Sequence, residues 1–268
     1  MQRCLSFTSL AGGLQSPHHF YFSLLRCSDD GALGMAYGLI VTSSLLATGS
    51  PPAIASASVH AAEIVTTGLA GGSHVWHKNI DWKLFYRLAP AGVIGGAIGA
   101  SILVGLPEEW VKGFVGLYLV VLTAVITRRV LTEPKKKKRH RRPGKEMQVI
   151  PIGVGGGLLD AIGGGGWGPI VTSTLIVRGD HPRQSIGSST LSEFFLTVAV
   201  SATFVLSLDI TRYAEIVGGL IIGGAIAAPF AGWFSRIIPM RWLMIMVATV
   251  IAVLAAVNIG QLIFSGKT

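Results

Sequence analysis

Long stretches without a single charged residue dominate the pattern of this chain. Residues 88–106, 216–235 and 242–266 contain no Asp, Glu, Lys or Arg. Each stretch is close to the roughly 20 apolar residues with which a helix crosses the hydrocarbon core of a bilayer. Only 13% of all residues are charged, compared with about 25% in an average soluble domain. The pattern predicts an all-α fold class, a polytopic bundle of transmembrane helices.

The apolar segments fall into two sets of four. We place them at about 31–49, 53–71, 84–105 and 110–131 in the first set, and at about 148–177, 184–207, 213–235 and 241–264 in the second. The expected organisation is an atypical N-terminal segment (1–29), a first transmembrane repeat (30–131), a basic cytoplasmic loop (132–147) and a second transmembrane repeat (148–264).

The two halves are related in sequence. A shift of 130 residues places residues 30–71 on residues 160–201 without a gap. The identical positions include three that shared apolar composition would not align: an aspartate (Asp30 and Asp160), a proline (Pro52 and Pro182) and a glutamate (Glu63 and Glu193). Internal duplication of this kind is typical of secondary transporters.

The N-terminal segment departs from this repeat. By the same shift, residues 148–160 should be matched by an apolar segment at 18–30, yet HHFYFSLLRCSDD holds two His, an Arg and two Asp. The mismatch favours a truncated first helix or a wrongly assigned start.

The positive charge of the chain is local. The net charge is +9, and residues 128–145 alone hold ten basic residues and one acid, Glu133, so this segment carries all of it. A basic run can bind nucleic acid or anionic lipid, but between apolar segments it is typical of a cytoplasmic loop that follows the positive-inside rule. We therefore expect the protein to lie in a lipid bilayer and to bind no nucleic acid.

The loop also orients the helices. If every segment crosses the membrane once, four arginines of the second half face the outside: Arg178, Arg183, Arg236 and Arg241. If the first segment of each half is instead a re-entrant hairpin broken at its glycines, these arginines move to the cytoplasmic side. Three crossings and one hairpin per half also make the two repeats inverted in the membrane. We expect this inverted topology.

A run of glycines followed by Pro169 interrupts the first segment of the second half. Glycine costs about 1 kcal/mol relative to alanine inside a helix, and proline suits the first turn of a new half-helix. We predict a broken helix whose backbone amides cradle an anion; the alternative is close helix packing by small residues. The predicted substrate-binding residues here are Gly163, Gly164, Gly165, Gly166, Trp167, Gly168 and Pro169, with Tyr37 and Gly38 from the first half. Gly95 is expected to be a packing position in a continuous helix, where substitution by alanine should cost little function compared with Gly165→Val.

Glu63 and Glu193 are the only charged residues of their segments and occupy equivalent repeat positions. An ionisable group in a spanning helix costs about 2.5–3.5 kcal/mol on insertion scales, so it indicates function. We predict that at least one of the two handles protons beside the substrate path; the alternative is a protonated glutamate that makes a structural hydrogen bond between helices. His60, one helical turn from Glu63, is expected to modulate its proton affinity, although Thr190 replaces it in the second half. The predicted polar lining beside them comprises Ser58, Thr67, Ser188, Ser189 and Thr197.

Three further features receive structural roles. Asp30 and Asp160 precede the glycine stretches and are expected to cap half-helices; the alternative is that they bind a cation. His74 and His77 flank Trp76 and fit interfacial anchoring better than metal binding. Two cysteines are too few for a disulfide framework or a metal-binding motif. We expect no metal and no cofactor.

The two repeats resemble a known family. DAIGGGGWGPIVTSTLIVRGDHPRQSIGSSTLSEFFLT resembles one half of the TauE/SafE sulfite-exporter family, and DGALGMAYG with SASVHAAEIVTTGLAGGSHVWHKNIDWKLF resembles the other. The resemblance runs from about residue 30 to about residue 260. It implies a multi-pass permease of the bacterial inner membrane, a family in which some members are linked to export of sulfite or sulfonate-derived anions.

The expected function is therefore a secondary permease, possible as a homo-oligomer, that exports a small sulfur-containing anion with proton coupling. An uptake permease for another small anion is the first alternative. A membrane-embedded enzyme is less favoured, because no set of nucleophile, base and orienting group stands out. A structural scaffold would not need the duplicated glutamate and glycine breaks.

Overall fold

The computed structural model describes residues 37–47, 50–131, 148–178 and 181–208, together with a few positions between 245 and 260. All the regular elements in these ranges are helices. Three of them are long and apolar enough to cross a membrane: α4 (Pro52–Trp76), α5 (Trp82–Gly105) and α9 (Pro182–Ser207). The expectation of an all-α membrane protein is confirmed at this level.

The remaining described helices are α3 (Tyr37–Ala47), α6 (Glu108–Leu131), α7 (Val149–Gly163), a π-helical turn η4 (Gly168–Thr172) and α8 (Ser173–Val177). Six of the eight predicted apolar segments thus correspond to helical stretches. The segment at 213–235 lies outside the described residues, as do the N-terminal segment and the basic loop, and of the segment at 241–264 only scattered positions are described.

Helix starts follow from local sequence signals. Pro52 and Pro182, which occupy equivalent repeat positions, begin α4 and α9, because proline lacks the amide hydrogen that a first helical turn leaves unpaired anyway. Asp81 caps α5, and its carboxylate accepts hydrogen bonds from the amides of Lys83 and Leu84 at 3.0 and 3.3 Å.

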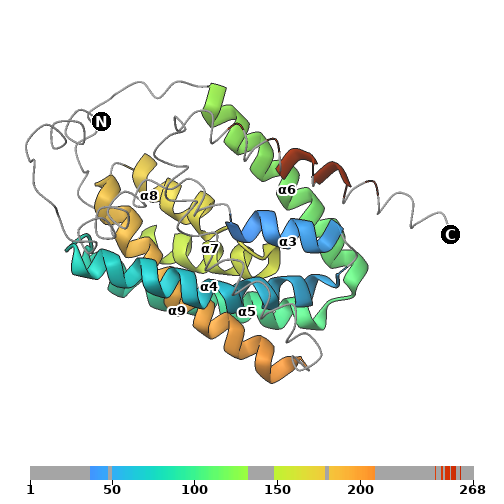
Figure 1. Cartoon of the computed structure of the whole chain (residues 1–268), viewed down its shortest axis with the longest axis horizontal. Coiled ribbons are helices and arrows are strands. Elements are labelled where there is room, and N and C mark those ends of the chain that lie inside the picture. The colour runs from blue at the N-terminus through green and yellow to red at the C-terminus, as the bar shows by residue number, and fades with distance from the viewer. Residues whose placement is uncertain are drawn as a thin grey trace, which may run out of the picture.

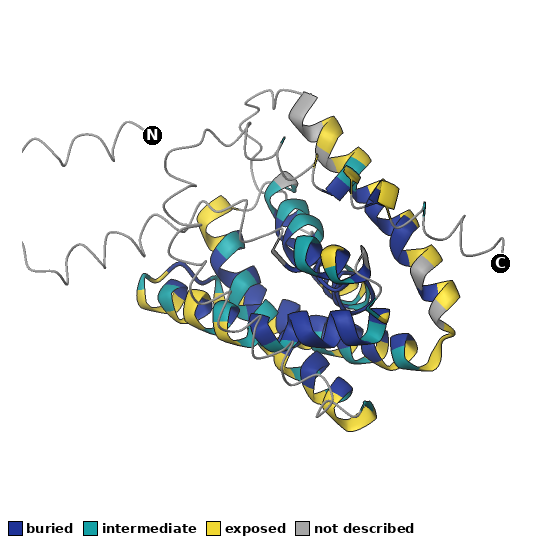
Figure 2. Ribbon diagram, turned by 45° about the vertical axis from the view of Figure 1, so that its right-hand side comes forward, coloured by how far each residue is buried: buried dark blue, intermediate teal, exposed yellow. Residues whose placement is uncertain are grey.

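α5 is the central helix of the described bundle. It packs along α7 on one side and α9 on another, and α4 packs along α9. Figure 1 shows α4, α5 and α9 as a layer of long helices, with α7 on that layer and α3 and α6 beyond it. Buried residues gather along the interior faces of these helices, whereas the outer faces of α4, α6 and α9 are exposed (Figure 2). This burial pattern suits helices whose outer faces meet lipid.

Glycines bring α5 and α7 into backbone contact. A Cβ atom on Gly95 would overlap the carbonyl oxygen of Val154, and one on Gly157 would overlap the carbonyl oxygen of Gly92. Small residues permit such close approach between membrane helices. Gly95 therefore lies at a packing position in a continuous helix, as expected, and the carbonyl of Val154 leaves no room for a side chain there.

We expect Gly95→Ala to lower stability by about 1–3 kcal/mol, the usual cost of overpacking a tight core. The matched control is Gly155→Ala in α7, because a Cβ there would meet nothing within 4 Å. Thermal unfolding in detergent should show a clear decrease for the first variant only. Equal unfolding temperatures would mean that α5 and α7 separate at little cost.

Candidate functional site

The helix break predicted from the glycine run is present. α7 ends at Gly163, and Gly164 and Gly165 follow with φ angles of +67° and +130°. Side chains rarely adopt these conformations, so glycine is required at both positions. The amides of both residues donate to the main-chain carbonyl of Asp160, at 3.1 Å in the case of Gly165.

Asp160 holds the far side of the break. Its Oδ1 accepts hydrogen bonds from the amides of Gly166 and Trp167 at 2.5 and 2.7 Å. A carboxylate at this place satisfies amides that have no partner within the next helical turn. The capping role predicted for Asp160 is confirmed.

η4 then runs back along α7. The cap joins Asp160 to Trp167, and four residues further on Val171 lies against Gly156, where a Cβ atom would overlap its side chain. Residue numbers thus decrease along α7 as they increase along η4, so the two segments run antiparallel. α7 and η4 therefore form a helical hairpin whose tip is the glycine break.

The tip of this hairpin meets the first half of the chain. Thr42 of α3 donates a hydrogen bond of 2.5 Å to the carbonyl oxygen of Gly164. The backbones of Gly38 and Gly165 touch, since a Cβ on either residue would overlap the backbone of the other. Gly38 and the second-half glycines, predicted as parts of one site, are thus brought together. Tyr37 begins α3, and its side chain lies outside the described residues.

The predicted anion cradle has an internal occupant. The amides of Gly166 and Trp167 are both bonded to the carboxylate of Asp160, so in this structure a ligand would have to compete with that carboxylate for them. Gly163 and Gly166 are covered by the ring of Tyr118 from α6. Sequence reasoning missed Tyr118, since a tyrosine in an apolar helix carries no positional signal.

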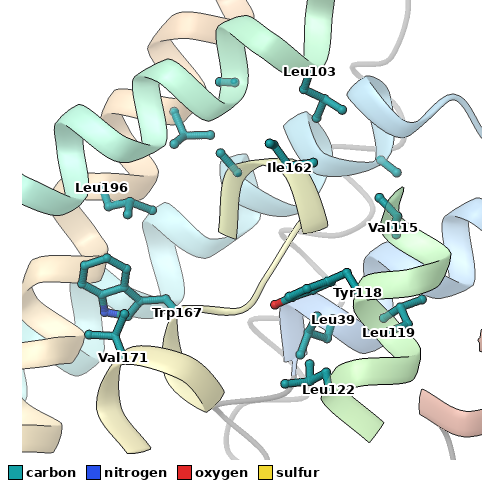
Figure 3. Close-up of a cluster of buried hydrophobic side chains, with 14 of the residues drawn as sticks. Leu39, Leu103, Val115, Tyr118, Leu119, Leu122, Ile162, Trp167, Val171 and Leu196 are labelled. Carbon is teal, nitrogen blue, oxygen red and sulfur yellow. The ribbon is translucent and has the colours of Figure 1, made fainter. Parts of the chain in front are cut away.

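Trp167 is fully buried beside the break. Its ring lies against Gly92 of α5, where any Cβ would overlap it, and its Nε1 donates to the carbonyl of Ser189 at 3.0 Å. Figure 3 shows Trp167 and Tyr118 at the two sides of the link between α7 and η4. The position is that of a core residue, not of a wall open to solvent.

We therefore expect Trp167→Ala to impair folding together with binding, at a cost of about 3–5 kcal/mol for truncating a buried aromatic. Trp167→Phe should retain most of the packing and lose one hydrogen bond. Thermal unfolding of both variants checks this order. A parent-like unfolding temperature for Trp167→Ala would mean that the ring contributes little to folding and acts in binding or selectivity instead.

The two glutamates converge with Asp160. Glu63 is 6% exposed, its Oε1 lies beside Gly38, and its Oε2 is buried without a hydrogen-bond partner among the described atoms. Glu193 of α9 is close enough for its charge to interact with those of Glu63 and Asp160. We call Glu63, Asp160 and Glu193 the acidic centre. Residues from both halves thus form one group of carboxyls beside the break, in which Glu63 and Asp160 are buried and Glu193 is half-buried.

The family model for the sulfite exporter TauE/SafE matches residues 28–258. This chain belongs to the TauE/SafE family. It is also 43% identical over 220 residues to the "Probable membrane transporter protein YtnM" of Bacillus subtilis (strain 168), an alignment that covers 81% of this chain and 73% of that protein. No solved structure matches the chain significantly. The resemblance noted from the motifs is confirmed, and the chain is a membrane transporter by family.

The remaining polar residues predicted for the site take different positions in this TauE/SafE chain. Thr67 and Thr197 donate to carbonyls of their own helices, those of Glu63 at 2.5 Å and Phe194 at 2.9 Å. Both hydroxyl hydrogens are thus engaged within their own helices, that of Thr67 four residues back along the chain and that of Thr197 three residues back.

Two of the three predicted serines have hydrogen-bond partners, and the third has none among the described atoms. Ser188 accepts from the amide of Asp81 at 2.8 Å and so ties α9 to the start of α5. Ser189 pairs with Thr172 at 2.6 Å. Ser58, the repeat partner of Ser188, has a buried hydroxyl without a hydrogen-bond partner among the described atoms. Ser58 is the member of this set with capacity left for a ligand or water.

His60 has a different partner from the one expected. Its Nε2 lies 3.1 Å from Oδ2 of Asp160, and its Nδ1 lies 2.8 Å from the carbonyl oxygen of Ser56. The ring therefore bonds to α7 across 100 positions of sequence, and any influence on Glu63 passes through the shared acidic centre.

Proposed function

We propose that this TauE/SafE transporter is a secondary permease that exports a small sulfur-containing anion, sulfite or an organosulfonate, across the bacterial inner membrane with proton coupling. The observation that carries the proposal is Glu63, whose buried carboxyl has an oxygen without a hydrogen-bond partner and lies beside the glycine break. An intramembrane carboxyl of this kind is by default a functional group. Membership of the TauE/SafE family supports the proposed sulfur-oxyanion substrate class.

Electrostatics supports the coupling to protons. Like charges in a medium of low dielectric constant repel strongly, and an anionic ligand that approaches ionised carboxyls meets the same repulsion. Protons bound at the acidic centre would remove that repulsion. We propose that Glu63 and Glu193 take up protons when the substrate anion is present.

The direct test is flux into liposomes that contain the purified protein. Labelled sulfite, or a labelled sulfonate that keeps its charge throughout the pH range, should accumulate along an imposed pH gradient, and the recovered anion should be chemically unchanged. A chemically altered product would favour the enzyme alternative. Vesicles with protein of known orientation separate export from uptake, and absence of flux for both anions would refute the substrate class.

We further propose that the two repeats are inverted and that each begins with a re-entrant hairpin. Two features support this. The repeat-related helices α4 and α9 run antiparallel, since Gly71 lies against Leu191 while Gly68 lies against Phe194. The α7–η4 hairpin turns back at its glycines.

The basic residues fit the same topology. The start of α9 lies against the link between α4 and α5, where Gly187 contacts Asn79 and Ser188 bonds to Asp81. Lys78, Lys83 and Arg183 therefore share one end of the bundle. By the positive-inside rule this end is cytoplasmic.

Accessibility labelling of single cysteines checks the topology. Lys138→Cys in the basic loop and Asp180→Cys before α9 should both be labelled from the cytoplasmic side, in a background without the two native cysteines. Glu109→Cys, at the exposed start of α6, should be labelled from the other side. Labelling of positions 138 and 180 from opposite sides would rule out the hairpin.

A further inference from the structure

The contact between His60 and Asp160 joins two buried residues of different halves. The two side chains are 0% and 1% exposed, and Nε2 lies 3.1 Å from Oδ2. The second carboxyl oxygen, Oδ1, holds the amides of Gly166 and Trp167. One carboxyl group therefore connects α4 to both arms of the α7–η4 hairpin.

The neighbours of the imidazole ring define where its hydrogens are. Nδ1 lies 2.8 Å from the carbonyl oxygen of Ser56, which can only accept, so Nδ1 carries a hydrogen. The hydroxyl of Ser56, 3.3 Å from Nδ1, donates its own hydrogen to the carbonyl of Ala161 at 2.6 Å. A bare Nδ1 would therefore face two oxygens without any hydrogen between them.

A neutral ring protonated at Nδ1 has a lone pair at Nε2, and an ionised carboxylate presents only lone pairs. Their 3.1 Å contact is attractive only if a hydrogen lies between them, on either atom. We propose that His60 and Asp160 together bind one exchangeable proton, and that this proton fastens α4 to the hairpin tip. The role of this proton in transport rests on the proposed function; its presence at the contact does not.

Loss of the proton would weaken the fastening. With the proton, the pair has zero net charge whichever atom carries it. Without it, the carboxylate of Asp160 faces the lone pair of Nε2, and His60 and Asp160 together carry one negative charge. This charge interacts with Glu63 of α4 and Glu193 of α9, and among the described residues also with Tyr118 of α6. The resulting repulsion favours movement of α4 away from the hairpin.

The histidine of this proton site is not repeated in the second half of the sequence. Thr190 stands at the position in α9 that is equivalent to His60, and threonine does not titrate. The glutamates are repeated and the histidine is not. A proton bound at this contact would therefore act on the second-half break alone.

The proton count can be measured without transport. Nitrogen NMR of ¹⁵N-histidine-labelled full-length protein in nanodiscs, with His60→Gln to identify the signal, should show either a doubly protonated ring or a ring protonated at Nδ1 with a hydrogen-bonded Nε2. A neutral ring whose only hydrogen is at Nε2 would overturn the proposal.

The coupling role is tested by Asp160→Asn. Asparagine keeps a carbonyl oxygen for the two amides and places an N–H opposite Nε2, so the contact remains without an exchangeable proton. We expect a near-parental unfolding temperature and loss of one protonation step, with a limiting slope of about tenfold per pH unit, from the pH profile of sulfonate flux. Retention of that step would overturn the coupling role.

His77→Gln is the matched control. His77 caps the C-terminal end of the same helix, and its Nδ1 contacts the carbonyl of Ser73 at 2.8 Å as that of His60 contacts Ser56. This variant should keep the parental pH profile. If Asp160→Asn does not fold, His60→Gln replaces it, because its amide can donate to the Asp160 carboxylate. If the parent moves no sulfonate at any pH, the proposed function fails while the NMR result still decides on the proton.

Discussion

Gly165→Val is expected to abolish anion binding and to destabilise the hairpin tip. Gly165 has a φ of +130°, and a Cβ there would overlap the backbone of Gly38 and Leu39. The backbone conformation alone costs a side chain about 1–3 kcal/mol, and a β-branched residue also forces α3 away from the tip. Thermal-shift titration with sulfite in detergent measures both effects, the unfolding temperature and its response to the ligand.

Two controls separate the break from glycine content in general. Gly155→Val lies in α7 at a place with no neighbour within 4 Å, so it should keep the response to sulfite. Gly165→Ala has the same φ problem with less bulk and should fall between the two. If Gly165→Val binds sulfite like the parent, the glycines serve packing and the substrate binds elsewhere.

Glu193→Gln is expected to reduce pH-driven sulfite flux to the level of protein-free liposomes while the protein remains in the membrane. Glutamine keeps the shape and hydrogen-bonding capacity of the side chain, but it cannot release a proton. Glu63→Gln should act in the same way, since both glutamates belong to the acidic centre. The measurement is initial flux along an imposed pH gradient, with the amount of folded protein determined by size-exclusion chromatography.

Glu109→Gln is the control for this pair, because Glu109 is exposed at the start of α6. Its flux should equal that of the parent. Normal pH-driven flux in Glu193→Gln would reduce Glu193 to a structural role. Flux that persists but no longer responds to the gradient would identify the residue as the point of coupling.

The internal repeat and the helix break were predictable from the sequence. Pro52 and Pro182 begin equivalent helices, and the break falls at the predicted glycines because positive φ angles and backbone contact exclude side chains there. Glu63 and Glu193 stood out because a charge inside an apolar helix is costly, and the structure brings both near Asp160. These features carry a local physical signal that one sequence is enough to detect.

Pairings across the halves carried no such signal. His60 and Asp160 are separated by 100 positions, and no feature of either segment indicates that the two residues are in contact. Tyr118 is one aromatic residue in an apolar helix, and it is assigned to the break only once α6 is placed. Gly95 is an intermediate case: the sequence predicted a packing position in a continuous helix, but it did not identify the carbonyl of Val154 as the packing partner.

The contact of α5 with α7 has a consequence for biogenesis. The ribosome delivers α3 to α6 before α7 leaves the exit tunnel, so the glycine face of α5 is already in the bilayer when the second half arrives. α7 is short, rich in glycine and ends at a break, and it would gain little from helix propensity alone. We therefore expect the second half to fold against the first, and a chain that stops after α6 would leave the glycine face of α5 without its packing partner.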